Sequence, residues 1–158
     1  MPDTKNQIAN ITLDERTVVR RSADVEHERA VAIYDLLDEN VFAPRAGGAG
    51  PFDLSLSVEE NRLIFDIRNE AGAEVDRFAV ALVPFRRIVK DYFTVCESYY
   101  AAIKTAPPSQ IEAIDMGRRA LHNEGSELLR ERLEEKVETD FPTARRLFTL
   151  LCVLHLKG

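Results

Sequence analysis

Large apolar residues occupy every second position in three segments in the middle of the chain, near residues 52–58, 63–67 and 78–82. The apolar positions are Phe52, Leu54, Leu56, Val58, Leu63, Phe65, Ile67, Phe78, Val80 and Leu82. A period of two is typical of strands with one buried face. The intervening turns at 59–61 and 69–72 are short, and Gly72 can adopt a positive φ. This pattern predicts an antiparallel meander of three strands, with a fourth short strand from Ile8 to Leu13 at a sheet edge.

Four other segments have the three- and four-residue spacing of amphipathic helices. The first, 22–40, begins with a capping Ser22 or Asp24, and the second begins at Pro84 and ends before Pro107. In the third, 109–137, Ser109 and Glu112 fit a capping box. The last begins after Asp140, and its part from 147 to 156 is apolar nearly all round. That part is interpreted as a central buried helix, with a buried strand as the alternative.

These elements together predict an α+β fold, in which the three- to four-stranded antiparallel meander packs against about four helices. A chain of 158 residues fits a single globular domain with a core of its own. Residues 1–7 are predicted to be a frayed tail. Residues 44–51, PRAGGAGP, are predicted to be a flexible loop, because neither a Walker pattern nor a helix follows the glycines.

Composition narrows the functional classes without naming one. The formal net charge of −6 and a pI near 5.2 disfavour nucleic-acid binding, which needs a basic surface. No apolar run is long enough to span a membrane, and the N-terminus lacks the apolar core of a secretory signal. Cys96 and Cys152 both lie in apolar segments, as expected of buried thiols in a reducing compartment. We therefore expect a cytoplasmic protein.

The helix predicted over 109–137 carries the most informative polar residues. On a continuous helix, Asp115, Arg118, His122 and Ser126 form a row beside the apolar stripe, and Gly125 lies near the centre of that stripe. An arginine at such a position must form an ion pair or remain solvated, because burying an unpaired charge costs several kcal/mol. The row is therefore the first place to look for a site.

Three interpretations of this row remain open at the level of sequence. In the first, Arg118, His122 and Ser126 bind a small anion, and His122, oriented by Asp115, exchanges a proton. In the second, Arg118 forms a structural ion pair, for example with a glutamate from another helix, and His122 is a satisfied core histidine. In the third, Gly125 ends one helix and Ser126 starts another, which would disperse the row.

Other candidates are weaker. Arg86 and Arg87 at the start of the second helix are candidate anion ligands, and Arg145 and Arg146 repeat the arrangement at the start of the last helix. Three dispersed histidines give no metal-ligand spacing, so no metal and no cofactor is predicted. No G-x-S-x-G nucleophile elbow is present. Tyr100 lies at the edge of its helix stripe, where it suits contact with a partner or a second copy in a homodimer.

Several long blocks resemble one protein family: RRSADVEHERAVAIYDLL, ENRLIFDIR, PFRRIVKDYF, PSQIEAIDMGRRALHNEGSELL and ARRLFTLLCVLHLKG. The chain resembles the uncharacterised protein family 0262 of alphaproteobacteria from about Asn10 to Gly158, with departures mainly in the tail and the PRAGGAGP loop. The resemblance implies a small cytosolic bacterial protein with no established activity and offers no catalytic residues to carry over.

The leading functional hypothesis is a noncatalytic binding or regulatory module for a protein partner or a small anionic ligand. The alternative is a small enzyme acting on an anionic metabolite, with Arg118 as the substrate anchor and His122 as the acid/base.

Overall fold

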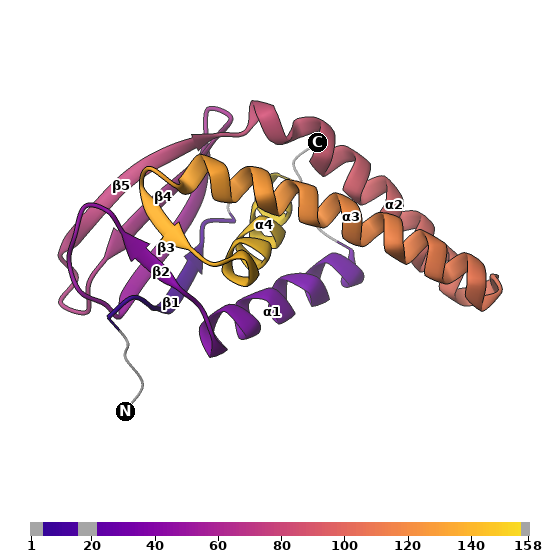
Figure 1. Ribbon diagram of the computed structural model, residues 1–158, viewed down its shortest axis with the longest axis horizontal. Coiled ribbons are helices and arrows are strands. Elements are labelled where there is room, and N and C mark those ends of the chain that lie inside the picture. Colours follow the sequence, from indigo (N-terminus) through magenta and orange to yellow (C-terminus); the bar gives the residue numbers. More distant parts are fainter. Residues whose placement is uncertain (1–4, 16–21, 156–158) are drawn as a thin grey trace.

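The alternating segments form a four-stranded sheet in the computed structural model, which describes residues 5–15 and 22–155 (Figure 1). The strands are β1 (Ile8–Leu13), β3 (Phe52–Glu59), β4 (Arg62–Arg68) and β5 (Glu74–Ala81). Their order across the sheet is β1-β3-β4-β5. Glu60 and Asn61 adopt a positive φ in the turn between β3 and β4, and Gly72 adopts one in the turn before β5. The α+β class and the three-strand meander are confirmed.

The sheet is mixed, so the prediction of a purely antiparallel sheet is wrong in one respect. β3, β4 and β5 pair antiparallel, but β1 runs parallel to β3, with Leu13 opposite Leu56. The reason is the connection: helix α1 (Ala23–Asp38) carries the chain from the end of β1 back to the end of the sheet where β3 begins. Parallel neighbours need such a crossover, whereas antiparallel neighbours need only a turn.

A second sheet, made of two short antiparallel strands, was not predicted. β2 (Phe42–Pro44) pairs with β6 (Val137–Thr139), so Phe42 lies opposite Thr139. The first residue of the loop predicted over 44–51, Pro44, therefore belongs to strand β2. Of the predicted frayed tail, residues 1–4 lie outside the described residues. The carbonyls of Lys5, Asn6 and Gln7 accept backbone hydrogen bonds from Gly50, Phe42 and Phe52, respectively.

Two helices begin with the predicted caps. Ser22 accepts a hydrogen bond from the backbone N–H of Val25 at the start of α1. Asp140 does the same for Thr143 at the start of α4 (Phe141–His155). The segment from 147 through His155 is thus helical, and Leu156 lies outside the described residues.

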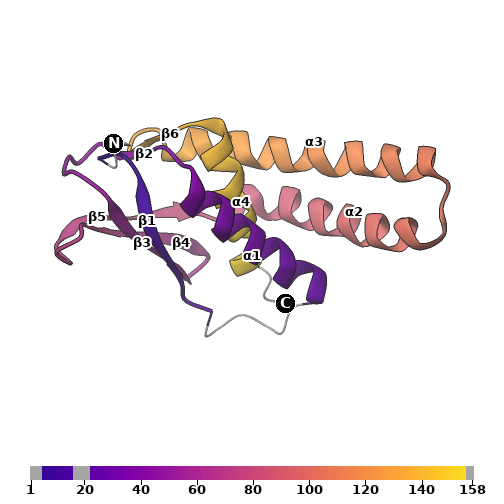
Figure 2. The same cartoon turned by 90° about the horizontal axis from the view of Figure 1, so that it is seen from below.

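The other two helices form a hairpin that extends well beyond the sheet (Figure 2). A 3₁₀ turn (Val83–Phe85) contains Pro84 and leads directly into α2 (Arg86–Thr105). α3 (Pro108–Leu133) starts one residue earlier than expected, with Pro107 as its N-cap, so the capping box at Ser109 is wrong. Proline at the first helical position needs no N–H partner. α3 ends at Leu133 rather than at Val137, which belongs to β6.

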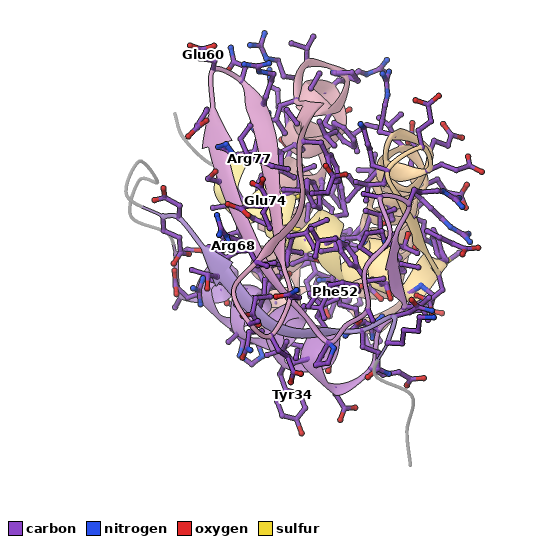
Figure 3. All side chains as sticks on the ribbon, turned by 90° about the vertical axis from the view of Figure 1, so that its left-hand side faces the viewer. Tyr34, Phe52, Glu60, Arg68, Glu74 and Arg77 are labelled. Carbon is purple, nitrogen blue, oxygen red and sulfur yellow. The ribbon has the colours of Figure 1, made fainter. Side chains whose placement is uncertain are left out.

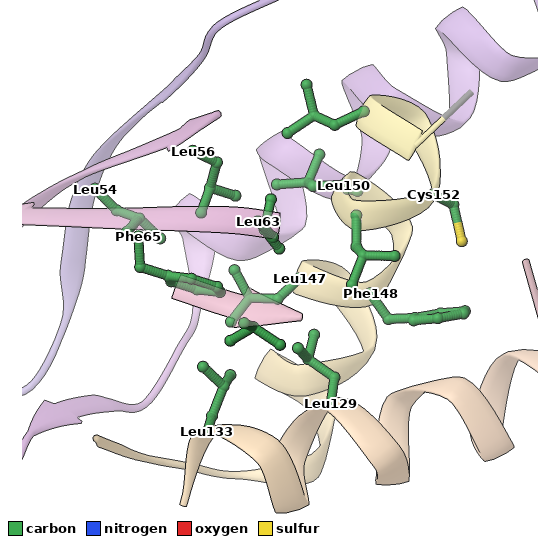
Figure 4. Packing of buried hydrophobic residues seen from close by; sticks show 14 of the residues in the cluster. Leu54, Leu56, Leu63, Phe65, Leu129, Leu133, Leu147, Phe148, Leu150 and Cys152 are labelled. Atoms are coloured by element: carbon green, nitrogen blue, oxygen red, sulfur yellow. The ribbon is translucent and has the colours of Figure 1, made fainter. Parts of the chain in front are cut away.

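Helix α4 is the centre of the core, because it packs against α1, α3 and β3. Nine of its fifteen residues are buried, and Leu147, Phe148 and Leu150 are at most 1% exposed. Figure 4 shows these side chains meeting Leu63 and Phe65 of the sheet and Leu129 of α3. The opposite face of the sheet is polar and carries exposed Arg68 and Arg77 (Figure 3). Among the described helices, none is long and apolar enough to cross a membrane.

Helix α3 continues through Gly125 because this glycine makes room for an aromatic ring of α4. A Cβ built on Gly125 would overlap three ring carbons of Phe148. The missing side chain therefore lets the ring of Phe148 lie directly on the backbone of α3. The third interpretation, a helix break at Gly125, is therefore wrong, and the row from Asp115 to Ser126 lies on one continuous helix.

Replacing Gly125 with alanine should destabilise the protein by about 1–3 kcal/mol, because the ring or the helix must move to admit the methyl group. Gly117 on the same helix is a matched control, since nothing lies within 4 Å of a Cβ built there. Gly117→Ala should leave the free energy of unfolding unchanged or raise it by up to about 1 kcal/mol. Urea denaturation measures both, and equal effects of the two substitutions would contradict the packing argument.

Candidate functional site

All four helices line one cleft of about 520 Å³. Its walls come from α1, α2, α3 and α4, and the residues are His27, Glu28, Val31, Ala32, Asp35, Tyr92, Tyr99, Tyr100, Arg118, Arg119, His122, Arg145, Arg146 and Thr149. The cleft contains two of the predicted ligand residues, Arg118 and His122, and both arginines at the start of α4. Concave sites of this size where elements meet are the usual location of small-molecule binding.

Arg118 is paired by a residue of its own helix and by residues of two neighbouring helices. Its Nη2 lies 2.6 Å from Oδ1 of Asp115 in the previous turn of α3, and its Nη1 lies 3.5 Å from Oε1 of Glu28 in α1. The guanidinium carbon also stacks 4.2 Å from the centroid of the Tyr99 ring. Partial burial lowers the pKa of Arg118, but the hydrogen bond and charge of Asp115 outweigh it, so the pKa is raised. This geometry is that of the structural ion pair with a glutamate from another helix.

Glu28 joins three helices through one carboxylate. Besides Arg118, its Oε1 accepts a hydrogen bond of 2.6 Å from the hydroxyl of Tyr100 in α2. Burial, followed by this hydrogen bond, raises the pKa of Tyr100. Since α1 packs mainly against α4 and β1, Glu28 is its polar connection to the hairpin. Nothing in the sequence around Glu28 distinguished it from the other acidic residues of α1.

His122 is buried between aromatic rings and hydroxyl groups. Its Nε2 lies 2.8 Å from Oγ1 of Thr149, and its Nδ1 lies 3.4 Å from Oγ of Ser126. Both hydroxyls also donate to backbone carbonyls, of Arg145 and of His122 itself. The rings of Tyr92 and Phe148 both pack against the imidazole, with ring centroids 5.4 Å and 5.2 Å from that of His122. The ring is thus oriented by Thr149 and Ser126 and not by Asp115, whose carboxylate is bound to Arg118 and Arg119.

The pKa of His122 is lowered to about 4, first by burial and then by the charges of Arg145, Arg118 and Arg146. The imidazole is therefore neutral at physiological pH. The positive charges of these three arginines thus disfavour a proton on the buried ring.

Arg145 differs from the other three arginines that line the cleft. Arg119 binds Asp115 at 3.2 Å, and Arg146 approaches Asp35 at 3.8 Å and donates to the carbonyl of Pro142. Arg145 has no carboxylate partner among the described residues, and its Nε is buried without a hydrogen-bond acceptor. A buried N–H without an acceptor costs about 1–3 kcal/mol. Sequence analysis placed this arginine near a helix start but could not reveal that it lacks a partner.

The remaining candidates lie outside the cleft or play a different role. Arg86 and Arg87 are exposed at the start of α2 and do not line the cleft, and Arg87 approaches Asp91 at 3.7 Å. Ser126 is fully buried below His122. Within residues 5–15 and 22–155, no group of three or more His, Cys, Asp or Glu residues is placed to hold a metal ion. Burial raises the pKa of Cys96 to about 11, which makes this thiol a poor nucleophile.

A family model described as "Uncharacterised protein family (UPF0262)" matches residues 5–157. The chain belongs to this family. A UPF0262 protein of Rhodopseudomonas palustris (strain TIE-1) is 60% identical over 156 residues, covering 99% of this chain and 96% of the relative. The UPF0262 protein BRADO6636 of Bradyrhizobium sp. (strain ORS 278) is 60% identical over 157 residues, covering 99% and 94%. No solved structure is significantly similar to the chain.

Membership of UPF0262 accounts for the long blocks noted in the sequence and agrees with the bacterial origin that they implied. A relative from Nitrobacter hamburgensis is 58% identical and likewise covers 99% of the chain. The descriptions of these relatives carry no activity, so the chemistry of the cleft rests on its geometry.

Replacing Arg118 with alanine should lower the free energy of unfolding by about 2 kcal/mol, because Asp115 and Glu28 lose a shared cation in a half-buried position. Arg119→Ala is the control, since Arg119 is 58% exposed and has a single surface pair. That substitution should cost less than about 0.5 kcal/mol. Urea denaturation at pH 7 measures the difference, and losses of equal size would show that Arg118 is not a structural partner.

The lowered pKa of His122 predicts a defined pH dependence of stability. Between pH 6.5 and about 4, the unfolded chain binds a proton at this residue that the folded chain does not. The folded state should therefore lose roughly 3 kcal/mol relative to a His122→Gln variant as the pH falls through this window. Denaturation of both proteins at several pH values measures the difference. A difference that stays constant with pH would mean that the buried imidazole titrates normally.

Proposed function

We propose that this protein is a noncatalytic binding module that holds a small anionic ligand in the cleft where its four helices meet. The observation that carries the proposal is the unpaired guanidinium of Arg145, whose buried Nε has no acceptor among the described residues. A water molecule can accept this hydrogen bond but leaves the charge uncompensated. A carboxylate or phosphate oxygen supplies both the acceptor and the opposite charge.

The charges around the cleft support an anion over a cation. Four arginines line it, against the carboxylates of Glu28 and Asp35. The formal excess is two positive charges, and it remains positive when Asp115, bound to Arg118 and Arg119, is included. This local excess is notable in a chain with a net charge of −6. Low-dielectric walls concentrate the field of such a cluster.

The same geometry weighs against catalysis by Arg118 and His122, although both line one cleft with further arginines, as an enzyme would require. Arg118 already binds two carboxylates, so it offers little to a substrate. An efficient general acid or base has a pKa near the operating pH, whereas the pKa of His122 is about 4. A small enzyme acting on an anionic metabolite is therefore the less supported alternative.

A protein partner remains the second candidate function, on the strength of a different surface. Tyr34 and Leu37 lie about one turn apart on α1, are 72% and 40% exposed, and do not line the cleft. Tyr34 projects away from the body of the protein (Figure 3). Exposed aromatic and aliphatic residues on one helix face favour contact with another protein.

Anion binding can be tested with the full chain and one matched pair of variants. NMR titrations with inorganic phosphate and small carboxylates should show saturable binding. Arg145→Met, which keeps the apolar stem, should weaken it by about tenfold or more without loss of thermal stability, because no ion pair is broken. Arg87→Met, in an exposed residue outside the cleft, should leave binding unchanged. Equal binding by wild type and Arg145→Met, or no saturable binding by wild type, would refute the proposal.

A further inference from the structure

The cleft is much larger than the head group that Arg145 can bind. Acetate or inorganic phosphate would occupy only a small part of 520 Å³, whereas cavities of this size enclose whole metabolites. A larger ligand with its head group on Arg145 would also contact the other walls. Those walls include five apolar or aromatic side chains, which are Val31, Ala32, Tyr92, Tyr99 and Tyr100.

Val31 is the most exposed of these five residues in relative terms. It is 42% exposed, on the α1 side of the cleft, while Ala32 and Tyr92 behind it are each 5% exposed. Covering such a side chain removes apolar area from water and favours an apolar ligand body. The phenol of Tyr100 is already committed to Glu28, so its ring contributes mainly apolar surface.

The charged groups set an upper limit on the negative charge of the ligand. Arg118 and Arg119 share Asp115, Arg118 also approaches Glu28, and Arg146 approaches Asp35, which leaves Arg145 as the unpaired cation of the lining. His122 adds no second positive charge, since its ring is neutral. Glu28 and Asp35 on the α1 wall would repel further phosphate groups. The site is thus balanced for one negative charge, and the fork of a guanidinium fits a carboxylate in two hydrogen bonds.

We infer that the ligand is a small amphiphilic carboxylate, with its head group on Arg145 and an apolar or aromatic body against Val31 and the tyrosine rings, and not a polyphosphate. This inference rests on the proposed function and specifies the ligand class for the same cleft.

The test compares five probes by NMR titration of the full chain: phenylacetate, acetate, phenylacetamide, inorganic phosphate and ATP. Phenylacetate should bind about tenfold more tightly than acetate, because its phenyl ring covers the apolar wall, and about tenfold more tightly than its amide, which keeps the ring but lacks the charge. Phosphate and ATP should bind no more tightly than acetate. Arg145→Met should reduce phenylacetate binding to the level of the amide.

The Val31→Ser variant tests the contribution of the ligand's apolar body to binding separately from that of its head group. It should weaken phenylacetate binding by about threefold to tenfold and leave acetate binding unchanged. Val41→Ser is the matched control, since Val41 is 40% exposed but does not line the cleft. It should change neither.

The outcomes distinguish this inference from the proposed function. If ATP or phosphate binds most tightly and the binding depends on Arg145, the ligand class is wrong and the anion site stands. The same holds if Arg145-dependent binding is equal for acetate and phenylacetate or insensitive to Val31→Ser. If no probe binds through Arg145, both are wrong.

Discussion

The contact between Phe148 and the backbone of α3 at Gly125 determines how the helices of this protein are arranged. Because no Cβ separates them, the aromatic ring brings α3 and α4 close together at this level. Phe148 in turn packs on Tyr92 of α2 and on His122. Thr149, the next residue of α4, then reaches the imidazole. The polar centre of the cleft exists because one glycine and one phenylalanine fix the spacing of two helices.

A second constraint closes the cleft on its other side. Glu28 connects α1 with Tyr100 of α2 and Arg118 of α3, although α1 packs mainly against α4 and β1. The same pairing satisfies Arg118, whereas Arg145 has no carboxylate partner within residues 5–15 and 22–155, and its buried Nε has no acceptor there. Under the proposed function, Arg118 forms structural ion pairs and Arg145 binds the ligand, which reverses the order in which sequence analysis ranked these two arginines.

The sequence predicted the elements whose signals are local. Alternation identified the three meander strands, and Ser22 and Asp140 marked helix starts through their own side chains. The direction of β1 could not be read in this way, because a period of two is the same in parallel and antiparallel strands. β2 and β6 are three residues long and exist through their mutual pairing. The structural role of Gly125 was likewise ambiguous from the sequence, because Phe148, which fills the space beside it, is distant in the chain.

The candidate site was likewise predicted only where its signals lie within one segment of the chain. Helical spacing put Arg118, His122 and Ser126 on one face, and the structure keeps them there. Spacing along one helix cannot show that the nearest carboxylate comes from α1 or that Arg145 on α4 faces the same cleft. These facts depend on packing between helices, and no single segment encodes them.

The parallel pairing of β1 with β3 also has a consequence for the order of folding. The β3–β4–β5 meander and the α2–α3 hairpin are built from contacts close in sequence, which form early at low entropic cost. β1 and α1 join through contacts with residues far along the chain, such as Leu13 with Leu56 and α1 with α4. They are therefore expected to dock late and to open first in the native state. Since α1 forms one wall of the cleft, that wall is expected to open together with β1 and without unfolding of the rest of the core.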